Sequence, residues 1–316
     1  MNKNIRKNKS KKGIAWFVVI AILAVAIGIH LHNEKQKREA IVAQHHLQLL
    51  VTDYFKSKPP EIFESPTSIV YLISFQQEYA QKATDAVQKC KNVSPLASKI
   101  AGHYSEFRCS LFENGYSKMI QVGQKQEQRE AVNKMLRGQE ICFFKPQDKV
   151  KFRMPSALYW NDRWKAVMIQ ISAWPETVFA GMLIHELGHG YYSTVLHSKS
   201  ADSPQLSKAW VEEEIIMHEL EAAVFNELSH GEYYRICDAV IAKAKGNQAP
   251  QILARLELSD LDALDGCLGA KVVSPELANL LVAEHLITIC CRYADKHQLG
   301  MDAKIDIYRW LSSGKL

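Results

Sequence analysis

The chain has 316 residues, of which 47% are hydrophobic, so it is long and apolar enough to bury a core, and wholesale disorder is excluded. Its net charge is +5, but six of the 39 basic residues precede the first acidic residue, Glu34. The remaining 33 basic residues nearly balance the 34 acidic residues. A balanced charge argues against a nucleic-acid partner, which would need a basic surface.

The N-terminus has the pattern of a membrane-targeting element. A basic tail, residues 1–13, precedes an apolar run, residues 14–31, that contains no acid and no strong base. About 17 to 25 apolar residues cross a bilayer as a helix, and positive charge marks the cytoplasmic end. We therefore expect a single-pass signal anchor with the rest of the chain extracytoplasmic, in the periplasm or outside the cell. Ala24-Val25-Ala26 also resembles a signal-peptidase site, so cleavage stays an alternative.

Residues 32–139 are expected to form a helical, membrane-proximal region. Two Ser-Pro pairs, Ser65-Pro66 and Ser94-Pro95, indicate helix starts, because serine caps a helix and proline fits its first turn. The predicted helices cover residues 33–55, 66–91, 95–112 and 116–136.

In residues 140–230 the sequence pattern no longer predicts helices alone. Short runs rich in β-branched and aromatic residues predict a small sheet, with strands at 150–153, 156–160 and 166–172. Pro175-Glu176 then opens a helix that we expect to end soon after His189, because Gly188 and Gly190 lower helix propensity. A loop over 191–208 and a glutamate-rich helix over 210–228 follow.

Residues 231–316 are predicted to be helical again, in pieces at 233–245, 250–256, 261–264, 275–294 and 301–311. The sequence thus predicts an α+β fold that is predominantly helical. It comprises a transmembrane helix, a helical region, a core with a small sheet and site-bearing helices, and a helical C-terminal region.

One motif contains both the ligands and the base that a catalytic metal site needs. His185-Glu186-Leu187-Gly188-His189 places two histidines at i and i+4 on one helix face, close enough to bind the same metal ion. Apolar residues 182–184 precede it, so the helix is expected to be buried, and buried ionisable groups need a metal or polar partners. Glu186 is placed to act on a water molecule beside the ion.

The motif resembles the active-site helix of the zincin metallopeptidases. The metzincin branch would have glycine at 192 and histidine at 195, where this chain has Tyr192 and Val195. The gluzincin branch, whose third metal ligand is a glutamate on a later helix, is more similar. Its E-x-x-A-D pattern resembles residues 219–223, although Ala223 stands where the family has aspartate.

That resemblance implies a site with His185 and His189 as zinc ligands and Glu186 as the general base. It implies Glu219 as the third ligand. Glu221 is the alternative, and Glu214 is a third possibility, because periodicity leaves more than one buried face on that helix. A group that stabilises the transition state is also expected, and four residues lie within plausible reach: Tyr191, Tyr192, His218 and Tyr233.

The function that follows is a membrane-anchored zinc metallopeptidase acting on proteins or peptides. The alternative is a membrane-tethered helical binding or assembly protein whose metal is structural or whose site is inactive. The seven cysteines show no zinc-ribbon spacing, and an extracytoplasmic location would permit disulfides such as Cys90–Cys109 and Cys237–Cys267.

Overall fold

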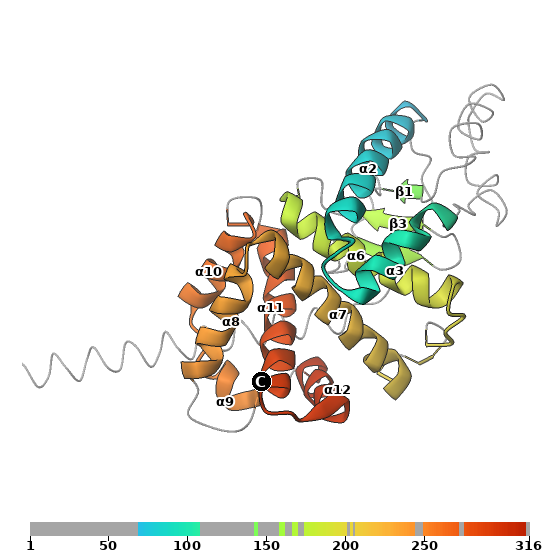
Figure 1. Cartoon of the computed structure of the whole chain (residues 1–316). Coiled ribbons are helices and arrows are strands. Elements are labelled where there is room, and N and C mark those ends of the chain that lie inside the picture. Colours follow the sequence, from blue (N-terminus) through green and yellow to red (C-terminus); the bar gives the residue numbers. More distant parts are fainter. Residues whose placement is uncertain are drawn as a thin grey trace, which may run out of the picture. The chain divides into compact units, whose positions relative to one another are not determined.

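Two adjacent helices, α6 (Glu176–Thr194) and α7 (Lys208–Leu228), carry the motif and the glutamate-rich segment. The computed structural model describes residues 69–107, 142–144, 158–161, 166–169, 174–200, 203–204, 206–243, 249–271 and 275–313. All of these residues belong to one compact unit, residues 48–316. Figure 1 shows α6 and α7 side by side, with other helices packed against each of them.

The first hydrophobic core joins α6 to the N-terminal helices. It contains residues of α2 (Ile69–Cys90), α3 (Pro95–His103), α6 and α7, and a one-turn 3₁₀ helix, Tyr104–Glu106, follows α3. The predicted start of α3 is confirmed, because the Ser94 Oγ accepts a hydrogen bond of 3.0 Å from the backbone N–H of Ala97.

A three-stranded sheet packs beside these helices. Its strands are β1 (Cys142–Phe144), β2 (Leu158–Asn161) and β3 (Ala166–Ile169), in the order β1-β3-β2. β1 runs parallel to β3, with Cys142 opposite Ala166, and β2 runs antiparallel to it, with Asn161 opposite Ala166. The strand β1 contacts α2, and β2 contacts α6.

Close packing of α6 on α7 depends on two glycines. A Cβ added to Gly181 would lie 2.3 Å from the ring of Phe225, and one added to Gly188 would lie 2.1 Å from the sulfur of Met217. The predicted end of this helix soon after His189 is therefore wrong. The helix continues to Thr194, because the glycines admit the partner helix and the packing outweighs their low propensity.

The second core joins α6 and α7 to the C-terminal helices. These are α8 (Glu232–Lys243), α9 (Ala249–Leu253), α10 (Leu258–Cys267) and α11 (Pro275–Lys296). A third core joins α7 and α11 to α12 (Gly300–Ser312). The positions of these C-terminal helices follow the helical pieces predicted from the sequence. The helices α11 and α12 both contact α7, which brings the C-terminal region against the glutamate-rich helix.

The expected α+β fold with a zincin-like core needs correction. In the part of the chain that the structure describes, most residues are helical, and each strand has only three or four residues. The hydrophobic cores are built mainly from helices, and the described strands contribute Phe143 and Val167 to the first of them. The expected zincin-like core, built on a small sheet, is therefore wrong, and the cores of the described residues are helical.

The predicted membrane topology is also corrected. Residues 14–31, the expected span, lie outside the described residues. Within the described ranges, no helix is both long and apolar enough to cross a bilayer. The described residues thus give no support to the expected single-pass anchor or to the extracytoplasmic location that depended on it.

The cysteines bear on the disulfides expected from the sequence. Cys237 and Cys267 are free thiols, so the disulfide considered between them is not formed, whereas Cys109, the candidate partner of Cys90, lies outside the described residues. The helices predicted at 33–55 and 116–136 and the strand at 150–153 also lie outside them. The domain boundaries stay predictions.

Candidate metal centre

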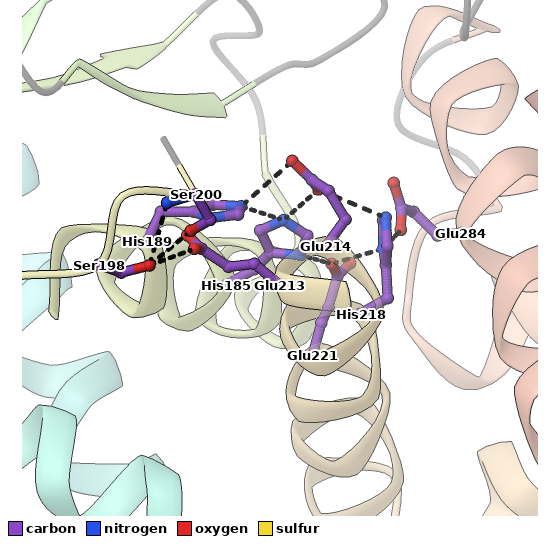
Figure 2. A network of polar contacts seen from close by, with 9 residues as sticks. All are labelled: His185, His189, Ser198, Ser200, Glu213, Glu214, His218, Glu221 and Glu284. Atoms are coloured by element: carbon purple, nitrogen blue, oxygen red, sulfur yellow. Dashed lines mark hydrogen bonds and ion pairs between the residues drawn. The ribbon is translucent and has the colours of Figure 1, made fainter. Parts of the chain in front are cut away.

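The two histidines of the motif face each other from successive turns of α6. His185 is buried and His189 is partly buried, and their Nε2 atoms are 3.2 Å apart. Figure 2 shows both rings directed toward the side chains of α7. The i, i+4 spacing thus produces the pairing of imidazoles that the sequence predicted.

Each of these histidines has a carboxylate on its other ring nitrogen. The Nδ1 of His185 lies 3.0 Å from Glu221 Oε2, and the Nδ1 of His189 lies 2.8 Å from Glu213 Oε1. An ionised carboxylate only accepts hydrogen bonds, so beside such a carboxylate the Nδ1 atom carries the proton. For Glu221, burial and the charge of Glu284 raise the pKa to about 7. In the neutral rings, both Nε2 atoms then present lone pairs to each other, which is the arrangement of histidines bound to a metal.

The third donor is Glu214, whose carboxylate spans the two histidines. Its Oε2 lies 3.7 Å from the Nε2 of His185, and its Oε1 lies 3.6 Å from the Nε2 of His189. Between neutral imidazoles and the carboxylate, these contacts join lone pairs, which repel one another in a dry site unless a proton or a metal ion lies among them. The side chain of Glu214 is 15% exposed, so water screens it little.

The donor set fits zinc. Zinc is bound at about 2.0 to 2.1 Å by histidine nitrogen and carboxylate oxygen, which places the donors of a tetrahedral ion about 3.3 Å apart. The two Nε2 atoms, 3.2 Å apart, match that value, and each lies 3.6 to 3.7 Å from a different oxygen of Glu214, so this carboxylate would bind the ion through both of its oxygens. Nitrogen and carboxylate donors in this number are typical of a catalytic zinc site.

The electrostatics of the cluster also favour a cation. Burial alone would lower the pKa of His189, but Glu214 and Glu213 outweigh it and raise that pKa to about 10. His185 behaves in the same way, and Glu214 and Glu221 raise its pKa well above the ordinary value. Burial would raise the pKa of Glu214, yet the two histidines hold it well below its usual range. The carboxylates therefore stabilise positive charge here, as protons or as a metal ion.

The ligand inferred from the family resemblance, Glu219, is not brought to the histidines. It makes an ion pair with Lys304 on α12, and its side chain is 34% exposed. The alternative, Glu221, does enter the cluster, where it holds the Nδ1 of His185. Glu221 therefore supports His185 from the Nδ1 side. The family resemblance had left this supporting role without a residue, because Ala223 stands where the family has aspartate.

Two members of the cluster, Glu213 and Glu284, were not predicted as site residues. Glu213 holds His189 and lies 3.4 Å from the Ser198 hydroxyl, which donates to it. Glu284, on α11, lies 2.7 Å from the Nδ1 of His218, a residue singled out earlier only as one of four within reach. The i, i+4 spacing of Glu214 and His218 could have indicated a pair, but no sequence signal links α7 to Glu284.

The other residues that the sequence singled out lie at different distances from the cluster. Glu186 follows His185 on α6, is partly exposed, and contributes to the raised pKa of that histidine. Tyr233 lies in a different buried network, with its hydroxyl 2.9 Å from the Nδ1 of His285. Tyr191 packs against the ring of His103. Among the four residues named as transition-state candidates, His218 is the one that the contacts place in the cluster.

Comparisons of the chain with known protein families, curated proteins and solved structures found no match.

Proposed function

We propose that the chain is a zinc-dependent hydrolase, and specifically a metallopeptidase. The observation that carries this proposal is the convergence of His185 Nε2, His189 Nε2 and the Glu214 carboxylate, with each imidazole held at its Nδ1 by a further glutamate. The H-E-x-x-H motif supplies the adjacent Glu186, and its resemblance to zincins is what favours peptide bonds as the substrate.

Each residue of the site has a distinct role in the proposed reaction. His185, His189 and Glu214 would hold the ion, while Glu213 and Glu221 fix the orientation of the two imidazoles. Bound zinc supplies a Lewis acid that polarises a substrate carbonyl and lowers the pKa of water. Glu186 takes a proton on its carboxylate and later returns it to the leaving amine, as a general base and then a general acid.

Replacing Glu186 with glutamine tests the proposal. We expect Glu186→Gln to lower the rate of hydrolysis by about 10² to 10⁴, because a carboxamide cannot accept the proton. Its zinc content should equal that of the wild type, since Glu186 is not one of the proposed ligands. The assay would follow cleavage of fluorescein-labelled casein and of a mixed peptide library, with zinc measured on the same preparations.

Glu227→Gln provides the matched control, because Glu227 lies exposed near the end of α7. It should leave both hydrolysis and zinc content unchanged. If the full-length wild-type protein holds zinc but cleaves neither probe, or if Glu186→Gln retains full activity, the proposed mechanism is wrong.

A further inference from the structure

His218 is a third histidine directed at the same cluster. It lies one turn after Glu214 on α7, its residue is 3% exposed, and its ring centroid is 4.7 Å from that of His185. Its Nε2 lies 4.0 Å from Glu214 Oε2, the oxygen that also faces the Nε2 of His185. One oxygen of Glu214 and the two imidazoles His185 and His218 are close enough to share a single ion.

The hydrogen-bonding state of His218 is unusual for a buried side chain. Neither ring nitrogen has a hydrogen bond of acceptable geometry. The Nδ1 nevertheless lies within ion-pair distance of Glu284 Oε2, at 2.7 Å, and a carboxylate at that distance favours the proton on Nδ1. In the neutral ring, the Nε2 is then a buried lone pair facing a carboxylate oxygen, and such a pair is costly without a cation to satisfy it.

The surroundings of His218 repeat those of the two motif histidines. In all three, the Nδ1 lies 2.7 to 3.0 Å from a glutamate that is itself buried: Glu221, Glu213 and Glu284 respectively. In all three, the Nε2 faces the carboxylate of Glu214, at 3.6 to 4.0 Å. Figure 2 shows these side chains gathered around Glu214.

We infer that His218 Nε2 is a fourth protein ligand of the ion held by His185, His189 and Glu214, so that the centre has three imidazoles and one carboxylate. This inference rests on the proposed metal binding but is independent of the peptidase reaction. With the Glu214 carboxylate counted once, four protein donors complete a tetrahedral shell, so a substrate oxygen would bind as a fifth ligand, which zinc accepts in some transition states. Glu284 is then a positioning residue that orients His218 from α11.

X-ray absorption of the zinc-loaded, full-length protein tests the inference, because imidazole rings give a distinct multiple-scattering signal. We expect three imidazoles per zinc ion in the wild type and two in His218→Ala. The zinc dissociation constant of His218→Ala should rise at least tenfold, measured by competition with a chromogenic chelator. His230→Ala, at an exposed position just after α7, is the matched control and should change neither quantity.

Two imidazoles in the wild type would overturn the inference, and that count needs no variant, so a failure of His218→Ala to fold leaves the test intact. Glu284→Gln gives a second check, with a tenfold to hundredfold weaker zinc affinity expected from the loss of the supporting carboxylate. An unchanged affinity in that variant would contradict the positioning role. Cleavage that depends on Glu186 together with two imidazoles would uphold the proposed function while rejecting this inference.

Discussion

The glutamates of α7 differ in role because they differ in position around one helix. Glu214 faces both motif histidines, Glu213 and Glu221 each hold one of them from the Nδ1 side, and Glu219 pairs with Lys304. Hydrophobic periodicity could not choose among them, because apolar residues flank several faces of this helix. The choice is made by the rotation of α7 against α6, which depends on long-range packing.

The supporting carboxylates can be tested one by one. Glu221→Gln and Glu213→Gln should each weaken zinc binding about tenfold to hundredfold, because each loses the ionised acceptor that orients a ligating imidazole. Chelator competition at fixed pH would measure the dissociation constants.

Glu219→Gln is the control on the same helix, and its zinc affinity should match that of the wild type. If Glu219→Gln instead lost the metal while Glu221→Gln and Glu213→Gln kept it, the ligand inferred from the family resemblance would be restored and the assignment of Glu214 would fail.

Among the elements, the packing of α6 on α7 fixes the geometry of the centre. Much of the helical pattern could be predicted locally, as the cap at Ser94 and the starts of α6 and α11 at their prolines show. The extent of α6 could not be predicted locally, because the low helix propensity of Gly188 and Gly190 indicated an earlier end. The close packing of Gly188 against Met217 of α7 favours the longer helix. The β-branched and aromatic runs did indicate β2 and β3, but local pattern could not show that the cores would be built mainly from helices.

Gly181 offers a direct test of this packing. A methyl group there would overlap the buried ring of Phe225, so Gly181→Ala should destabilise the fold by about 1 to 3 kcal/mol. It should also weaken zinc binding, because α6 and α7 would separate. Urea unfolding and chelator competition would measure the two effects.

The matched control is Gly266→Ala in α10, where nothing lies within 4 Å of the added carbon. That change should leave zinc binding unaltered and raise the free energy of unfolding by about 0.5 to 1 kcal/mol, because alanine has the higher helix propensity. Equal stability in both variants would show that the α6–α7 contact tolerates a wider spacing.

Across the whole described molecule, the centre combines residues far apart in the sequence. His185 and His189 come from α6, the main carboxylates from α7, and Glu284 from α11, which begins more than 80 residues after the motif. Sequence reasoning found the motif because its spacing is local. It could not find Glu284, because the chain between α7 and α11 folds through three further helices before returning to the cluster.

The measurement that tests the central claim most directly is the metal content of the full-length protein. We predict one zinc ion per chain, retained through gel filtration and lost in His185→Ala and in Glu214→Gln, while Glu219→Gln keeps it. Circular dichroism would confirm that the variants remain folded. A folded wild-type protein without bound zinc, or a zinc content unaffected by His185→Ala, would contradict the account.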